Sequence, residues 1–230
     1  MRSFMRSLAR LGGFTLVELL TVMAVIAILA GLILSISGFA QKKGALARAQ
    51  AEIQALSSAC ESYKADNGTY PHQPLAVSGS IPLNAAIPSD SNSVDPRTQG
   101  GSAAGSGTPY MQASLELYEA LTGDLTCSGT GGAAGTKNYI PDIKPDVLGR
   151  TTPTTMVSSA NPVTYLSDPF GNSYGYSTIA GTLAASGSAV TMGYNPTFDL
   201  WSTGGTLNNP NVGSTAGQPG DPQLQWVKNW

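Results

Sequence analysis

The stretch Gly12–Leu20, which reads GGFTLVELL, decides how the chain is organised. It joins a short basic segment to an almost uninterrupted apolar run that lasts from Phe14 to Phe39. As an α-helix with a rise of about 1.5 Å per residue, this run would be about 39 Å long. That length exceeds the roughly 30 Å hydrocarbon core of a bilayer. We therefore predict a transmembrane helix over residues 14–39, preceded by a leader peptide over residues 1–13.

Glu18 is the only charged residue in the apolar run. A charge within a membrane helix costs about 2.5–3.5 kcal/mol on insertion scales, and such residues pair with another group. A carboxylate that is merely tolerated near the end of the helix is the alternative interpretation. We favour a functional role for Glu18.

The order of these features resembles the N-terminal signature of type IV pilins and type II secretion pseudopilins. A basic leader ends at Gly13, the sequence FTLVE follows at Phe14–Glu18, and a long apolar helix continues from there. The resemblance implies that prepilin peptidase cuts after Gly13 and methylates Phe14. It also implies that Glu18 pairs with the free amine of a neighbouring subunit in a filament. A buried carboxylate and a buried ammonium relieve each other's desolvation.

The charge balance indicates where the chain resides and which partners it lacks. Charged residues make up 11% of the sequence, and the net charge of −2 becomes −5 without Arg2, Arg6 and Arg10 of the leader. No basic stripe is present that could neutralise phosphates, so we expect no nucleic-acid partner. The basic leader places the N-terminus in the cytoplasm by the positive-inside rule. We expect a single-pass inner-membrane protein whose residues 40–230 form an extracytoplasmic domain.

The apolar helix continues as an amphipathic helix over residues 40–67. Apolar residues recur there at spacings of three and four, which predicts one face packed against a sheet. They are Leu46, Ala49, Ile53, Leu56, Cys60 and Tyr63. Asn67-Gly68 predicts the end of the helix, with a residue in the left-handed conformation, and Pro71 prevents the helix from continuing.

The rest of the chain predicts a small β-structure, so the fold class is α+β. Residues 68–160 read as a loop region with one short helix at Met111–Leu121, and residues 206–230 as a C-terminal tail whose tryptophans pack on the domain. Residues 161–205 predict an antiparallel β-meander. Its expected strands are Val163–Leu166, Ser173–Ile179, Ala189–Tyr194 and Thr197–Trp201.

A second resemblance concerns this β-region. The segments Asp168–Asn172 (DPFGN) and Phe198–Ser202 (FDLWS) resemble the C-terminal sheet of the major pseudopilin of type II secretion. In that subfamily Gly-Ala-Asp-Gly follows the serine, and its aspartates help to bind calcium. Here Thr-Gly-Gly-Thr follows Ser202. A calcium ion needs six to eight oxygen ligands, so we disfavour calcium and expect no metal or other cofactor.

Cys60 and Cys127 leave two interpretations open. They form a disulfide in an oxidising compartment, or Cys60 packs as a small apolar residue on its helix stripe.

The residues that an enzyme would need are scarce. His72 is the single histidine and lies in a proline-flanked loop, so no serine or cysteine triad is indicated. One histidine and two cysteines also fall short of a zinc site. We expect that the chain is not an enzyme and has no catalytic residue.

The function predicted from these features is structural. We expect a homo-oligomeric helical filament, a type II secretion pseudopilus that drives protein secretion. The resemblance implies other pseudopilins, an inner-membrane assembly platform and its ATPase as partners. The alternative is a type IV pilus subunit, or a minor pilin or adhesin that uses residues 72–109 as its recognition surface.

Overall fold

The structure is a computed structural model with two compact units, Met1–Gly44 and Ala45–Trp230. It describes residues 14–72, 94–97, 109–129, 132, 135–141, 143–150, 161–205 and 226–230. The predicted leader, the recognition loop and most of the C-terminal tail lie largely outside these residues.

The first unit contains the N-terminal part of α1, which spans Leu16–Asn67. Its length and composition are sufficient to cross a membrane. The helix runs unbroken through Gly31 and Gly38, where the sequence has low helix propensity. Every described side chain between residues 14 and 44 is exposed. The predicted long N-terminal helix is therefore confirmed, and its described side chains before Ala45 are exposed.

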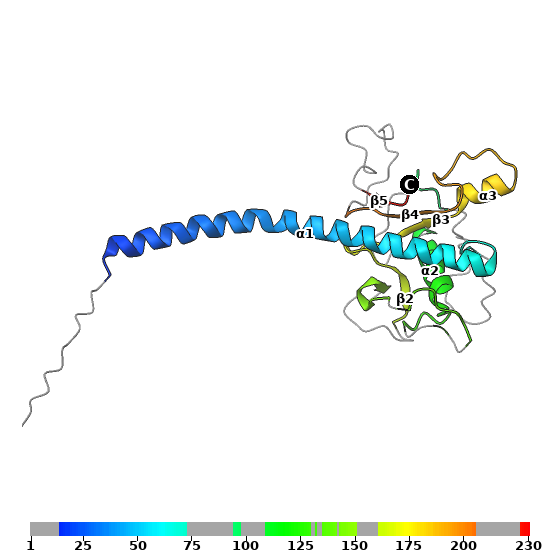
Figure 1. Ribbon diagram of the computed structural model, residues 1–230, viewed down its shortest axis with the longest axis horizontal. Coiled ribbons are helices and arrows are strands. Elements are labelled where there is room, and N and C mark those ends of the chain that lie inside the picture. Colours follow the sequence, from blue (N-terminus) through cyan, green and yellow to red (C-terminus); the bar gives the residue numbers. More distant parts are fainter. Residues whose placement is uncertain are drawn as a thin grey trace, which may run out of the picture. The chain divides into compact units, whose positions relative to one another are not determined.

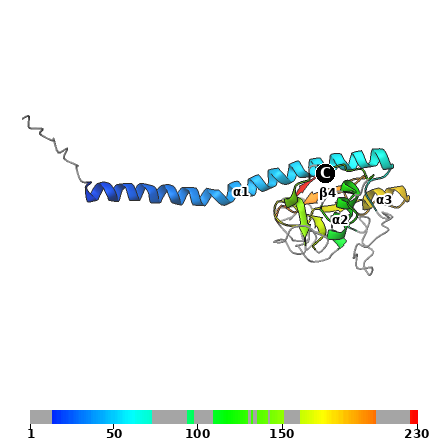
Figure 2. The ribbon, with the colours of Figure 1, turned by 90° about the horizontal axis from the view of Figure 1, so that it is seen from below.

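The second unit is built under the remainder of α1. Figure 2 shows α1 along one side of the unit and the other elements beneath it. The predicted apolar stripe faces this unit: Ala49, Ile53, Leu56 and Cys60 are buried. The helix ends as predicted, since Gly68 has φ +79° and its N–H donates to the carbonyl of Lys64 at 2.7 Å.

The unit contains two small antiparallel sheets, and in the view of Figure 1 β2 lies below the line of α1 while β3, β4 and β5 lie above it. The first pairs β1 with β2, and the second has the order β3-β4-β5. α2 packs on β2 and β3, and the Ser114 hydroxyl accepts the backbone N–H of Leu166 at 3.0 Å. The elements are α2 (Pro109–Thr122), β1 (Leu148–Arg150), β2 (Val163–Leu166), β3 (Gly175–Ser177), α3 (Ile179–Ala185), β4 (Asp199–Ser202) and β5 (Val227–Lys228).

The α+β class is confirmed, but the single four-stranded meander is wrong. β2 pairs with β1, which comes from the expected loop region, and β5 comes from the tail. The expected strand Ala189–Tyr194 is not a strand. Gly193 adopts φ +70°, and the N–H groups of Gly193 and Tyr194 donate to the carboxylates of Asp95 and Asp199. These N–H groups therefore bond to side chains and do not take part in a β-ladder.

The predicted turn after β2 is present. The N–H of Gly171 donates to the carbonyl of Asp168 at 2.9 Å, which closes a β-turn with Pro169 at its second position. The Asp168 side chain adds bonds from the N–H groups of Phe170 and Asn172 at 3.0 and 2.8 Å. The turn is therefore fixed by one aspartate.

The core has two parts. The larger part joins α1, α2 and the strands and contains Tyr118, Tyr174 and Tyr176. The smaller part surrounds Trp201, which is fully buried and stacks on Trp226 with ring centroids 6.0 Å apart. The end of the tail therefore packs its indoles on the domain, as the sequence predicted.

Both cysteines are free and buried in the larger core. The thiol of Cys127 donates to Glu119 Oε1 at 3.3 Å, and Cys60 is fully enclosed by apolar neighbours on the α1 stripe. Burial raises the pKa of both thiols above its ordinary value. In the structure both thiols are therefore packed in the core, and Cys60 and Cys127 do not form a disulfide.

Candidate functional site: the start of the apolar helix

The predicted assembly residues, Phe14 and Glu18, lie at the N-terminal end of α1. Phe14 is 88% exposed and lies two residues before Leu16, the first residue of α1. Glu18 lies in the first turn. Gly13, on the other side of the predicted cleavage site, lies outside the described residues.

Thr15 and Glu18 form a reciprocal capping arrangement. The Thr15 N–H and hydroxyl both donate to Glu18 Oε2 at 2.9 Å, and the Glu18 N–H donates to the Thr15 hydroxyl oxygen at 3.2 Å. This geometry is a capping box, in which two unsatisfied N–H groups of the first turn gain partners. It holds the Glu18 carboxylate at the very start of the helix.

The capping role was missed in the sequence interpretation, although the signal was present. Thr15-x-x-Glu18 directly before an apolar run is the capping-box pattern. The capping box does not provide a positive charge to pair with the Glu18 carboxylate. None of the ion pairs among the described residues includes Glu18, and Oε1 accepts no hydrogen bond from them.

The other half of α1 is fastened to its unit by polar contacts. Glu52 accepts the Tyr174 hydroxyl at 2.6 Å and pairs with Arg48 at 2.7 Å. Near the helix end, Asp66 accepts the Tyr139 hydroxyl at 3.0 Å and pairs with Lys137. These contacts, together with the buried stripe, make residues 45–67 an integral part of the domain.

The aspartates of the DPFGN and FDLWS segments, Asp168 and Asp199, accept hydrogen bonds from their own chain. Asp168 Oδ2 accepts the Ser202 hydroxyl at 2.6 Å, which brings the DPFGN turn into contact with β4. Asp199 accepts the N–H groups of Tyr194 and Asn195, both at 2.8 Å. Burial raises the pKa of both carboxyls above its ordinary range. Within the described part of the chain, no group of three or more His, Cys, Asp or Glu could hold a metal ion.

The comparison with known protein families finds a motif at the same N-terminal site. The family model of the prokaryotic N-terminal methylation motif matches residues 10–34. No curated protein and no solved structure matches the chain. The matched range contains Gly13, Phe14 and Glu18 and the first turns of α1. The chain therefore carries the prepilin-type N-terminal methylation motif on a long helix with a small antiparallel β-structure, which is the architecture of a type IV pilin-like protein.

Proposed function

We propose that the chain is a structural subunit of a type II secretion pseudopilus. Prepilin peptidase cuts it after Gly13 and methylates Phe14, and an inner-membrane platform and its ATPase stack it with copies of itself and with other pseudopilins. The stacked rod drives protein secretion. The chain has no catalytic role and needs no cofactor in this proposal.

The observation that carries the proposal is the exposed apolar helix with one carboxylate at its start. The large apolar side chains from Phe14 to Ile33 are more than half exposed, and burying them against lipid or other helices is favourable. In a membrane the helix satisfies its own backbone groups. In a filament the helices of neighbouring subunits replace the lipid.

Glu18 sets the register of stacking in this proposal. Cleavage creates an amine at Phe14, which lies about 6 Å in rise from Glu18 of the same chain. The amine of an axially shifted neighbour can approach Glu18 Oε1 while Thr15 holds Oε2. The capping box therefore positions the carboxylate, and the neighbouring amine neutralises it.

Contact between the two pseudopilin-like segments favours a pseudopilus over a type IV pilus. The Asp168–Ser202 hydrogen bond joins the DPFGN turn and the FDLWS strand into one unit. A type IV pilus subunit or a minor pilin or adhesin is the second candidate, because the same helix would serve it. Deleting the gene separates the two: loss of secreted proteins supports the pseudopilus, whereas loss of surface filaments alone supports the pilus.

The Glu18→Gln variant separates pairing from capping. Glutamine at this position still accepts the Thr15 bonds of a capping box, but it carries no charge for the neighbouring amine. With the assembly machinery present, we expect processed Glu18→Gln protein in the membrane and few sheared filaments. Glu18→Leu, which loses both roles, should assemble no better, and Glu18→Asp should be partly defective. Normal filament yield from Glu18→Gln would contradict the pairing.

A further inference from the structure

Two lysines follow the apolar part of α1. Between Phe14 and Gly44 the charged residues are Glu18, Lys42 and Lys43. The two lysines are adjacent and exposed, and they belong to the same unit as the apolar run. The C-terminal end of the apolar run is therefore marked by two neighbouring positive charges on the surface of the helix.

The length of the helix places these lysines at the surface of a bilayer. α1 is continuous from Leu16 to Lys43, and at about 1.5 Å per residue it rises about 40 Å over these residues. A bilayer is about 40–45 Å thick when its headgroup regions are included. A helix that begins in one headgroup layer therefore brings Lys42 and Lys43 into the opposite layer, where the lipid phosphates lie.

Lys43 has the surroundings of a basic side chain at a membrane surface. Its Nζ atom lies 5.2 Å from the centre of the Phe39 ring, one turn earlier on the helix. Lysines near the ends of membrane helices keep their alkyl chains against apolar neighbours and extend their amines to the interface. None of the ion pairs among the described residues includes Lys43. Its charge can therefore be matched by an anion from outside the chain.

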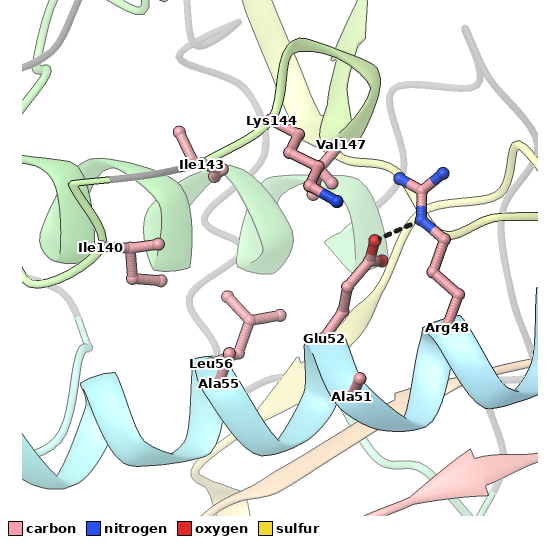
Figure 3. A pocket seen from close by; sticks show the side chains of 9 residues that line it. All are labelled: Arg48, Ala51, Glu52, Ala55, Leu56, Ile140, Ile143, Lys144 and Val147. Carbon is pink, nitrogen blue, oxygen red and sulfur yellow. Dashed lines mark hydrogen bonds and ion pairs between the residues drawn. The ribbon is translucent and has the colours of Figure 1, made fainter.

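The next cation on α1 is bound differently. Arg48 belongs to the other unit and pairs with Glu52 at 2.7 Å, as drawn in Figure 3, and with Asp146 at 2.6 Å. Two carboxylates of its own unit therefore satisfy Arg48. The part of the chain that the structure describes gives Lys43 no such carboxylate.

We propose that Lys42 and Lys43 bind the phosphate groups of anionic phospholipids at the extracytoplasmic surface of the membrane. The inference rests on the proposed membrane orientation and goes beyond the filament function. Lys and Arg are enriched on the cytoplasmic side of membrane proteins, so a basic pair on the opposite side needs a local reason. Binding would fix the depth of the subunit in the bilayer, and these contacts must break when the subunit enters a filament.

The test measures which lipids surround the two lysines. Gln41→Cys, labelled with a fluorophore, places a reporter beside them, and native Cys60 and Cys127 are buried, so the unsubstituted chain gives the labelling background. The full chain is reconstituted in phosphatidylcholine bilayers with a small fraction of either phosphatidylglycerol or phosphatidylcholine that is spin-labelled near the headgroup. Stronger quenching by the phosphatidylglycerol at the same fraction reports its enrichment. Lys42→Gln/Lys43→Gln should lower this enrichment about fivefold for each lysine, because a cation near an anionic surface gains about 1 kcal/mol.

Three controls separate lipid binding from other effects. Lys42→Arg/Lys43→Arg keeps both charges and should keep the enrichment. Lys144→Gln removes an exposed lysine of the globular unit and should leave the enrichment unchanged. High salt should reduce the enrichment around the chain that has both lysines, because it screens exposed charges.

Two kinds of result would contradict the account. Equal enrichment with and without the two lysines, or loss of enrichment in the double arginine variant, would overturn the lipid contact and leave the filament function intact. A reporter that neither spin-labelled lipid quenches would show that this end of the helix does not lie at a membrane surface, and it would contradict the proposed function as well.

Discussion

Glu119 should make the stability of the domain depend on pH. Its side chain is 2% exposed in α2, and it accepts the thiol of Cys127 at 3.3 Å. Burial, aided by the charge of Asp124, raises the pKa of Glu119 from 4.5 to about 7, although the bond from Cys127 acts in the opposite direction. The folded chain therefore binds a proton at this site more tightly than the unfolded chain.

The direction of the effect follows from that difference. Between about pH 4.5 and about pH 7 the folded state holds more protons, so the free energy of unfolding falls as the pH rises through this window. At about 1.4 kcal/mol for each tenfold change in proton affinity, the loss amounts to about 3 kcal/mol. Burial raises the pKa of Asp168 and Asp199 as well, so they act in the same direction.

Glu119→Gln isolates the contribution of this one carboxyl. The variant keeps the shape and an acceptor for Cys127, but it has no charge to bury. Between about pH 5 and about pH 8, the free energy of unfolding of the unsubstituted chain should fall by about 3 kcal/mol more than that of Glu119→Gln. The matched control is Glu61→Gln, which makes the same substitution at an exposed carboxyl of α1.

Urea unfolding of the detergent-solubilised chain, followed by tryptophan fluorescence, measures the effect. All three tryptophans lie in the unit Ala45–Trp230, so the signal reports on the unit that contains Glu119. The same pH dependence in Glu119→Gln and in the unsubstituted chain would refute the reasoning.

Two further predictions concern packing and the cysteines. A Cβ atom on Gly175 would lie 2.1 Å from Cε2 of Trp201, so Gly175→Ala should destabilise the domain in the same urea assay by about 1–3 kcal/mol through overpacking. Gly44→Ala, where no other side chain lies within 4 Å, should not destabilise it, and an unchanged midpoint for Gly175→Ala would contradict the close approach of β3 to Trp201. Labelling of the unfolded chain without reductant should find two reactive thiols, Cys60 and Cys127, while labelling of the folded chain should find none. A chain that needs reductant to be labelled would show that the two are bridged.

The helices could be predicted because their signals are local. The apolar run, the spacing of Ala49, Ile53, Leu56 and Cys60, and the cap at Gly68 are each read from residues that are close together in the sequence. The position of α2 was predicted for the same reason, since Gly123 ends it with φ +70°.

The sheets were less predictable because short strands depend on distant partners. β1 reads Leu-Gly-Arg and shows no alternation, and Gly149 is needed there because the Tyr165 ring of β2 lies over it. β5 has two residues and is fixed by pairing with β4. The segment expected as the strand Ala189–Tyr194 was misread because the bond from Gly193 to Asp95 spans almost half of the chain.

The N-terminal site was predictable in part. Cleavage after Gly13 and a role for Glu18 are predictions from the residue pattern, and the matched methylation motif at residues 10–34 contains both residues. The contact of Glu18 with Thr15 required only the capping-box pattern and was overlooked. The burial of Glu119 required the tertiary structure, because α2 packs on β2 and β3, which are far from it in the sequence.

The central claim is that the chain is a processed and methylated prepilin-type subunit. The most direct test is mass spectrometry of the protein purified from membranes that contain an active prepilin peptidase. The account predicts an N-terminal peptide that begins with N-methyl-phenylalanine at Phe14, and no peptide from residues 1–13. Gly13→Leu, which places a bulky residue before the cleavage site, should retain the leader. An intact Met1 N-terminus on the unsubstituted chain would contradict the account.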